Sequence, residues 1–295
     1  MSALFHSYLC GRNATEWLIK MKSSHLTPFL KWPGGKRWLM EKYRNCFPKD
    51  FHQLYEPFLG GGATFFYLTP DSAVLSDVNG DLINLYQVMR DSYAELAQYM
   101  RQHQALHCKD YYYHIRESKF DDPVQAASRF LYLNRTCYNG MYRVNKSGQF
   151  NVPIGTKTNC IYDIDLFEDY SILLKKASII AGDFATTISL AKESDLVFAD
   201  PPYAISENQD SFIKYNESLF TWKDQERLCN TLVAAKNRGA YIVATNVNYD
   251  LLQQMYKDNG FFLQVVEHYS VVSGNAKLRH KQKELLISSR PFIEK

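Results

Sequence analysis

Short apolar runs rich in β-branched residues alternate with stretches of helical periodicity through most of this 295-residue chain. The runs predict strands over residues 52–59, 73–79, 178–184, 195–200, 240–247, 262–272 and 284–289. The intervening patterns predict helices over residues 36–47, 79–103, 163–176, 184–193, 222–238 and 248–258. Such alternation is typical of parallel strands joined by crossover helices. The sequence therefore predicts an α/β fold, a mostly parallel sheet with helices on both faces.

Residues 105–160 interrupt this alternation. They carry helical patterns near 109–119 and 123–136, followed by a loop-rich run. Within that run, Lys146-Ser147-Gly148 separates two short segments that can pair as a β-hairpin. We interpret 105–160 as an inserted, mainly helical subdomain. Residues 1–26 precede the first motif, and Met21 is an equally plausible start, so this extension has no assigned role.

Composition limits the class of protein. Hydrophobic residues make up 46% of the chain, yet there is no apolar run of 18 residues, so we expect no membrane span. The charges within residues 1–20 argue against a signal peptide. The cysteines at 10, 46, 108, 137, 160 and 229 form no C-x-x-C pair and no zinc spacing. We expect reduced thiols, a cytoplasmic location and no metal cofactor.

The net charge of +3 is unevenly distributed. Residues 17–40, 123–162 and 268–283 hold five, five and four Lys and Arg residues, respectively, and no acid. If these windows converge in space, they form one basic face suited to a polyanion. The alternative is that they are ordinary solvated side chains.

A glycine-rich segment, EPFLGGGATFF (56–66), lies between a predicted strand and a helix. Gly60, Gly61 and Gly62 permit a tight turn and close approach of the backbone to a ligand. One strand later, Asp77 is placed to accept hydrogen bonds from ribose hydroxyls. The alternative for Asp77 is a cap on the helix that begins at Asn79. The two features together indicate a nucleoside-bearing cofactor.

The segment FLKWPGGK (29–36) resembles a phosphate-binding loop only in part. A Walker A motif requires a glycine where Leu30 stands and Ser or Thr where Arg37 stands. Nucleotide hydrolysis is therefore disfavoured. Lys36 is nevertheless placed to reach a carboxylate, and Trp32 to pack on a flat ring.

The segment DPPY (200–203) follows the apolar run 196–199. Proline cannot donate to a neighbouring strand, so the chain must leave the sheet there in a stiff turn. The Asp200 carboxylate and the Pro201 carbonyl can both accept N–H bonds from an exocyclic amine of a nucleobase. They would thereby aim the lone pair of the nitrogen at an electrophile. Tyr203 can stack on an extruded base, and aromatic faces favour a cationic methyl donor.

Seven motifs from about Pro28 to Arg290 resemble, in order and spacing, the Dam-like, α-class DNA adenine-N6 methyltransferases. They are FLKWPGGK, EPFLGGGA, SDVNGDLI, RTCYNG with a following arginine, FNVPIG, AGDF and DPPY. The resemblance implies a seven-stranded Rossmann-like methyltransferase sheet flanked by helices, with its last strand antiparallel. Residues 27–104 and 161–295 would form the catalytic domain, and 105–160 the target-recognition insert.

The resemblance also implies roles for individual residues. S-adenosylmethionine would be bound by Trp32, Lys36, Glu56, Phe58, Gly60, Gly62, Asp77, Asp183, Phe184 and Asp200. The catalytic residues would be Asp200, Pro201, Pro202 and Tyr203. Bases would be contacted by Lys31, Tyr138, Asn139, Met141 and Arg143, with Tyr138 intercalating. The alternatives are a buried tyrosine at Tyr138 and a phosphate contact at Arg143.

We therefore expect a monomeric, site-specific DNA adenine-N6 methyltransferase that flips its target base out of double-stranded DNA. GATC is the expected target, although relatives that methylate it often have alanine at Pro33 and SNHD in place of TNVN (245–248). The alternatives are methylation of RNA adenine or of cytosine N4 in DNA, and a catalytically silent DNA-binding homologue. A hairpin-bearing insert favours duplex DNA, because the deep major groove of RNA is poorly accessible. The intact DPPY argues against a silent homologue.

Overall fold

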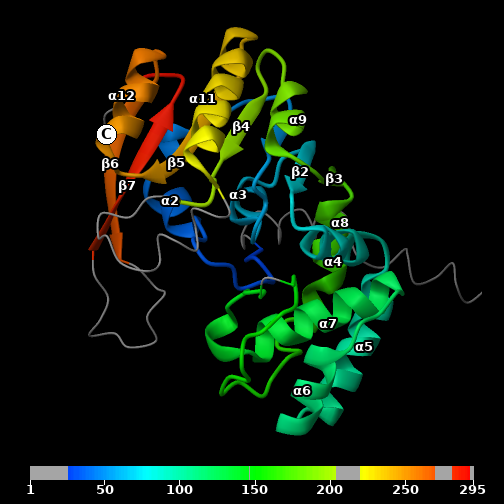
Figure 1. Cartoon of the computed structure of the whole chain (residues 1–295). Helices are drawn as coiled ribbons and strands as arrows, with labels where there is room; N and C mark the ends of the chain where they lie inside the picture. The colour runs from blue at the N-terminus through cyan, green and yellow to red at the C-terminus, as the bar shows by residue number, and fades with distance from the viewer. Residues whose placement is uncertain (1–25, 146, 204–219, 270–280, 293–295) are drawn as a thin grey trace, which may run out of the picture.

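A computed structural model describes residues 26–145, 147–203, 220–269 and 281–292 of the chain. Seven strands form one sheet in the order β3-β2-β1-β4-β5-β7-β6. Their bounds are β1 (Leu54–Glu56), β2 (Ala73–Asp77), β3 (Ala177–Ala181), β4 (Leu196–Ala199), β5 (Tyr241–Val247), β6 (Phe262–Tyr269) and β7 (Lys281–Ser288). Strands β1 to β5 pair in parallel, whereas β7 is antiparallel to both of its neighbours. The expected methyltransferase sheet with an antiparallel last strand is thus confirmed (Figure 1).

The central strands are almost entirely buried because helices cover both faces of the sheet. On one face, side chains such as Leu54, Leu75 and Phe198 share a core with seven helices. These are α2 (Arg37–Lys42), α3 (Ala63–Leu68), α4 (Gly80–Asp91), α5 (Tyr93–Leu106), α6 (Lys109–Glu117), α7 (Pro123–Thr136) and α8 (Phe167–Leu174). On the other face, Val197 and Ile242 pack with α9 (Phe184–Ser189), α11 (Trp222–Asn237) and α12 (Asp250–Asp258). Short 3₁₀ turns occupy 44–46, 138–140 and 164–166.

Some predicted bounds are wrong. The helix predicted over 79–103 is two helices, because Ser92 has a non-helical φ of −137° and divides α4 from α5. Helix α4 packs against β2, β3 and α7, and beyond the break at Ser92 helix α5 packs against α7 and α8. Strand β7 begins at Lys281, earlier than predicted. The end of the strand predicted over 262–272 and nearly all of the extension 1–26 lie outside the described residues.

The two helices predicted within 105–160 are present as α6 and α7, below the sheet in Figure 1. Buried side chains such as Tyr112 and Leu131 join the same core as the sheet, so this segment is packed on the catalytic body. The expected hairpin is reduced to two isolated antiparallel bridges among the described residues, Val144 with Phe150 and Cys137 with Ile154. Asn145 N–H donates to the Gln149 carbonyl at 2.8 Å and closes the turn.

Candidate active site

The Asp200 carboxylate lies just beyond the carboxyl end of β4, where the two prolines take the chain out of the sheet. Three groups contact its Oδ1 atom: Thr245 Oγ1 at 2.6 Å, Lys36 Nζ at 3.1 Å and Tyr203 Oη at 3.4 Å. Within the described part of the chain, no donor is hydrogen-bonded to the second oxygen, Oδ2. The site therefore holds the carboxylate by one oxygen and leaves the other as an acceptor.

Lys36 supplies the positive charge of this site. It immediately precedes α2, only 3% of its side chain is exposed, and it also donates to the Gly34 carbonyl at 2.9 Å. Its Nζ lies 3.5 Å from Glu284 Oε2 and 4.9 Å from the centre of the Tyr203 ring. Burial alone would lower the pKa of Lys36, but Asp200 and Glu284 outweigh that effect and raise it. Lys36 therefore stays charged at neutral pH.

Glu284 and His268 belong to the same cluster, although sequence reasoning missed both. Glu284 Oε2 accepts from the Tyr203 hydroxyl at 2.8 Å, and Glu284 Oε1 lies 2.7 Å from His268 Nε2. The His268 ring stacks on Trp38 at 4.2 Å between ring centres. Because β7 is antiparallel, its first residues lie beside the carboxyl end of β5, where Glu284 pairs with Val247. The only sequence feature that could have indicated Glu284 is that a single acid directly precedes the apolar run 285–287.

The glycine-rich turn is held by Asp77. Asp77 Oδ2 accepts from Gly60 N–H at 3.1 Å, and Oδ1 accepts from Asn79 N–H at 3.0 Å. Helix α4 is capped by Asn79, whose side chain accepts from Leu82 N–H, so the capping alternative for Asp77 is wrong. Each carboxylate oxygen has a second lone pair, so Asp77 can still accept from a ligand hydroxyl. The expectation that it binds a ribose, based on its place at the end of the second strand, stays a prediction.

Gly60 has no room for a side chain. Its φ is +47°, and a Cβ there would lie 2.7 Å from Cδ1 of Trp32. Gly62 also has a positive φ, of +66°, and begins α3. The indole of Trp32 therefore lies directly against the backbone of the turn, which brings the first two motifs together.

Glu56 and Phe58 directly precede the glycine turn in the chain and pack against residues around it. Glu56 is 2% exposed, and its Oε2 accepts from Phe65 N–H at 3.1 Å near the start of α3. Burial, with a smaller contribution from the charge of Asp200, raises the pKa of Glu56 to about 8. Phe58 stacks on Phe184 at 5.3 Å. Glu56 is thus buried and holds the start of α3, and its contact with a cofactor stays a prediction.

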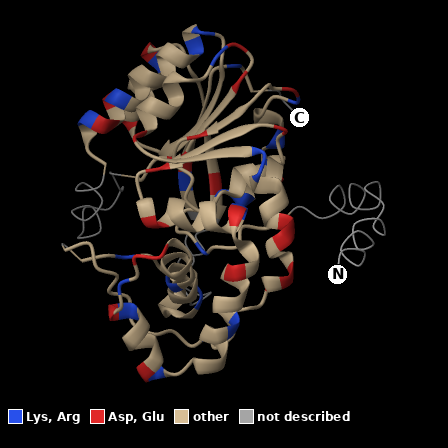
Figure 2. Cartoon of the chain, turned by 90° about the vertical axis from the view of Figure 1, so that its right-hand side faces the viewer, with Lys and Arg blue, Asp and Glu red and all other residues tan. Residues whose placement is uncertain are grey.

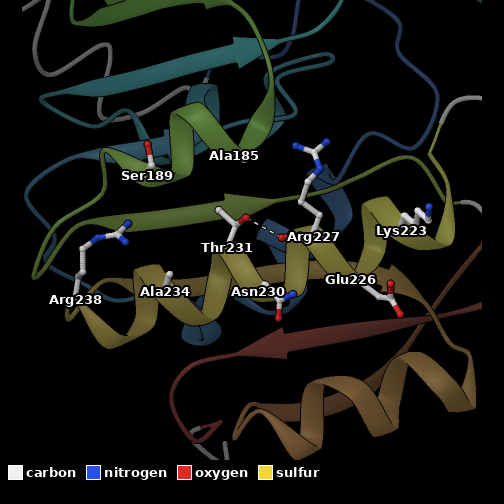
Figure 3. A pocket seen from close by; sticks show the side chains of 9 residues that line it. All are labelled: Ala185, Ser189, Lys223, Glu226, Arg227, Asn230, Thr231, Ala234 and Arg238. Carbon is white, nitrogen blue, oxygen red and sulfur yellow. Dashed lines mark hydrogen bonds between the residues drawn. The ribbon is translucent and has the colours of Figure 1, made fainter.

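Asp183 and Phe184 lie at the start of α9. Asp183 caps the helix through Ala185 N–H at 2.9 Å and forms an ion pair with Arg227 at 2.6 Å. The Arg227 guanidinium lies 4.1 Å from the centre of the Phe184 ring, which is buried. Arg227 and Ser189 also line a shallow groove between α9 and α11 (Figure 3). None of the residues around Asp200 lines that groove.

The segment predicted to recognise DNA contacts the first motif. Lys31 N–H donates to Asn134 Oδ1 at 3.1 Å, and Asn134 Nδ2 returns a bond to the Lys31 carbonyl at 2.8 Å. Trp32 stacks on Tyr142 at 5.3 Å between ring centres. A Cβ on Gly140 would lie 2.4 Å from Cδ of Lys31, so the turn at 138–140 packs closely on that side chain. Segments about a hundred residues apart thereby form one surface next to the glycine turn.

The predicted base-contacting side chains have different environments. Tyr138 is 51% exposed, so the alternative of a buried tyrosine is wrong. Asn139 is exposed with a φ of +56°, and Met141 is half-buried. Arg143 is exposed, but its Nε donates to Asn151 Oδ1 at 2.7 Å, which fixes its direction. Their contacts with DNA stay predictions.

The expected basic face is partly wrong. Lys36 lies in the active site, and Arg135 is buried in an ion pair with Asp163. Arg129 donates to the carbonyl of Ile115 at 2.9 Å. On the described helices, Lys and Arg are interspersed with acids (Figure 2). Five of the counted cations lie outside the described residues: Lys20, Lys22, Lys146, Lys277 and Arg279.

Two classes of feature are absent from the part of the chain that the structure describes. No helix there is long and apolar enough to cross a membrane. No group of three or more His, Cys, Asp or Glu side chains is arranged there to hold a metal ion.

Comparisons with known proteins identify the family of the chain. The family model of D12 class N6 adenine-specific DNA methyltransferases matches residues 32–272. The type II methyltransferase M1.LlaDCHI of Lactococcus lactis subsp. cremoris is 34% identical over 92% of this chain and 98% of its own. The DNA adenine methylase of Escherichia coli K12 is 31% identical over 90% of this chain and 96% of its own.

Among solved structures, a precorrin-8w decarboxylase from Methanobacterium thermoautotrophicum aligns with 90% of this chain and 95% of its own. Its TM-score is 0.38 at 10% identity, too low to support an argument about function. The family match and the relatives cover most of the chain, and the matched residues 32–272 span both the glycine turn and the DPPY turn. The chain therefore belongs to the D12 class of N6 adenine-specific DNA methyltransferases, a family of enzymes.

Proposed function

We propose that the protein transfers a methyl group from S-adenosylmethionine to the N6 amine of an adenine flipped out of double-stranded DNA. The observation that carries this proposal is the asymmetric Asp200 carboxylate. Oδ1 is held by Lys36 and Thr245, whereas Oδ2 has no donor among the described residues. An exocyclic amine has two N–H donors and requires acceptors, which Oδ2 and the Pro201 carbonyl would provide.

The chemical role of these acceptors follows from the amine. The N6 lone pair is delocalised into the purine ring, so the nitrogen is a poor nucleophile. Hydrogen bonds to Asp200 Oδ2 and the Pro201 carbonyl pull the nitrogen towards tetrahedral geometry and aim its lone pair. Pro202 stiffens the turn, and the Tyr203 ring would pack against the base. Because Tyr203 is anchored by Glu284, that ring has a defined orientation.

The residues fit the proposed cofactor. The positive φ of Gly60 shapes a tight turn, and the missing Cβ lets the Trp32 indole lie directly against its backbone. Asp77 retains acceptor capacity for ribose hydroxyls, and the rings of Trp32 and Phe58 provide apolar and π surfaces near a cation. When bound, S-adenosylmethionine supplies an electrophilic methyl group on a sulfonium centre. Asp183 and Phe184 would lie next to its adenine, and Lys36, Glu56 and Gly62 would shape the site.

For the DNA, we propose that residues 105–160 form the target-recognition insert. Lys31 and Arg143 would contact guanine edges, and the exposed Tyr138 would enter the base stack beside Asn139 and Met141. GATC is the proposed target, and we propose a cytoplasmic enzyme that acts as a monomer.

Purified protein incubated with methyl-labelled S-adenosylmethionine tests the proposal. Duplex DNA with and without GATC, single-stranded RNA and a duplex without adenine serve as parallel substrates. We expect label only on adenine-containing duplex DNA, recovered after digestion as N6-methyladenine. Label on the adenine-free duplex would indicate cytosine N4 methylation, and label on RNA would indicate an RNA enzyme. A folded protein that binds duplex DNA but transfers no label would be a silent homologue.

A further inference from the structure

Glu284 lies opposite Asp200 and contacts the same two groups. Lys36 Nζ is 3.1 Å from Asp200 Oδ1 and 3.5 Å from Glu284 Oε2. The Tyr203 hydroxyl is 2.8 Å from Glu284 Oε2 and 3.4 Å from Asp200 Oδ1. The Lys36 ammonium and the Tyr203 hydroxyl therefore each interact with both carboxylates.

We propose that Glu284 is a positioning residue for methyl transfer: it draws the Lys36 ammonium and the Tyr203 hydroxyl partly away from Asp200 and so keeps Asp200 a strong acceptor. This inference rests on the proposed function, in which Asp200 accepts a hydrogen bond from the target amine. In this arrangement a second carboxylate, from the antiparallel strand β7, acts beside the DPPY turn.

The charges explain why a second carboxylate matters. One buried ammonium faces two carboxylates, so its positive charge is shared. Without Glu284, Lys36 would pair with Asp200 alone, and the Tyr203 hydroxyl would turn towards Asp200 Oδ1, which it already approaches at 3.4 Å. Hydrogen bonds and an undivided ion pair would then withdraw electron density from Asp200 and weaken it as an acceptor.

His268 gives Glu284 its orientation. The two oxygens of Glu284 are divided between partners, with Oε1 on His268 and Oε2 on Tyr203 and Lys36. The His268 ring stacks on Trp38 of α2, the helix that Lys36 immediately precedes. The contact thereby links the Glu284 carboxylate to the segment that positions Lys36.

A purely structural role would not require the charge. The Glu284 side chain is only 7% exposed, so its carboxylate loses solvation on folding. In other proteins, apolar residues often replace buried ion pairs with no loss of stability. The amide variant Glu284→Gln keeps the shape and the acceptor for Tyr203 but removes the charge shared with Lys36. It therefore separates packing from electrostatics.

The first test is the steady-state kinetics of Glu284→Gln on duplex DNA. We expect kcat to fall about 10-fold or more, while KM for the cofactor and for DNA changes less than about threefold. Gln264→Ala, at an exposed position of β6 with no role in the site, is the matched control and should retain the wild-type kcat. Thermal unfolding of each variant shows whether its fold is intact.

The second test is a double-mutant cycle with Lys36→Met. Removing the ammonium leaves two neighbouring carboxylates without a cation, so adding Glu284→Gln in that background should raise kcat. The same substitution thus lowers the rate in one background and raises it in the other, which a structural role would not produce.

The outcomes are distinct. Wild-type protein without methyl transfer would overturn the proposed function itself. Active wild type with Glu284→Gln at full kcat would overturn only the role of Glu284, as would independent losses in the double-mutant cycle. If Lys36→Met does not fold, the kcat and KM values of Glu284→Gln alone decide.

Discussion

The Thr245 hydroxyl donates a 2.6 Å hydrogen bond to Oδ1 of Asp200 from the neighbouring parallel strand. Ala244 of β5 pairs with Ala199 of β4, so Asp200, the first residue after β4, lies level with Thr245 within β5. This bond fixes the rotation of the carboxylate and, with Lys36, leaves Oδ2 as the acceptor. The pairing of two strands thereby sets the orientation of the Asp200 carboxylate.

Thr245→Val should lower kcat by about 10-fold, because Asp200 loses the contact that sets its rotation. The valine is close in shape, so the fold should be kept. Thr245→Ser retains the hydroxyl and should stay within about threefold of wild type. Methyl-transfer assays on all three proteins test this, and equal rates for Val and wild type would show that Thr245 does not orient Asp200.

Asp77→Ala should weaken S-adenosylmethionine binding about 10- to 100-fold, since a charge-assisted hydrogen bond contributes about 1.5–3 kcal/mol. DNA affinity should change less. Asp81→Ala, at an exposed acid in the first turn of α4, is the control. Calorimetry gives both affinities. Unchanged cofactor affinity in Asp77→Ala would restrict Asp77 to bracing the Gly60 turn.

The strands were predictable because parallel strands buried on both faces appear as short apolar runs. The break at Ser92 was not predictable, since the hydrophobic periodicity continues through it and only the backbone conformation of Ser92 reveals the bend. The DPPY and glycine turns were also predictable, because both depend on neighbouring residues in the sequence. Their motifs specify backbone geometry directly.

The rest of the site depends on contacts between distant segments. Glu284 reaches Lys36 only because β7 is inserted antiparallel between β5 and β6, which no local pattern specifies. Arg135 was counted as a surface charge, yet Asp163, 28 residues later in the chain, pairs with it in the interior. Burial of a charge depends on such partners, so residue type alone predicts it poorly.

Glu56 should make the stability of the protein depend on pH. Its pKa rises from 4.5 to about 8 on folding, so the native state holds this proton more tightly than the unfolded state. The contribution of Glu56 to the free energy of unfolding is therefore largest below about pH 4.5. It is lost as pH rises to about 8, and the total loss is roughly 3–5 kcal/mol. Other groups titrate as well, so the informative quantity is the difference between variants.

Glu56→Gln removes that titration while keeping an acceptor for Phe65 N–H. Relative to wild type, the variant should gain stability between pH 5 and pH 8 in urea unfolding, whereas the exposed Glu95→Gln should run parallel to wild type. A constant difference between Glu56→Gln and wild type across that range would mean that Glu56 is ionised in the native state.

Arg143→Ala should relax the choice of base at one position of the target, because a bidentate arginine–guanine contact contributes about 1–3 kcal/mol of discrimination. Competition between oligonucleotides that differ from GATC at single positions measures this. Arg101→Ala, at an exposed arginine of α5, controls for loss of charge. A uniform loss of affinity with a shallower salt dependence would identify Arg143 as a phosphate contact.

The GATC assignment has an independent check. DNA from cells that express the protein should resist an endonuclease that is blocked by N6-methylated GATC. Complete cleavage, together with methylated adenines mapped at other sequences, would discard GATC as the target and leave the reaction unchanged.

The most direct test is nucleoside mass spectrometry of genomic DNA from a host without adenine methylation. Cells that express the wild-type protein should contain N6-methyladenine, and cells that express Asp200→Ala at the same level should contain about 10²-fold less or none. Asp250→Ala, at an exposed acid of α12, should match wild type. N4-methylcytosine in place of N6-methyladenine, or an Asp200→Ala protein that retains more than about a tenth of the wild-type modification, would contradict the account.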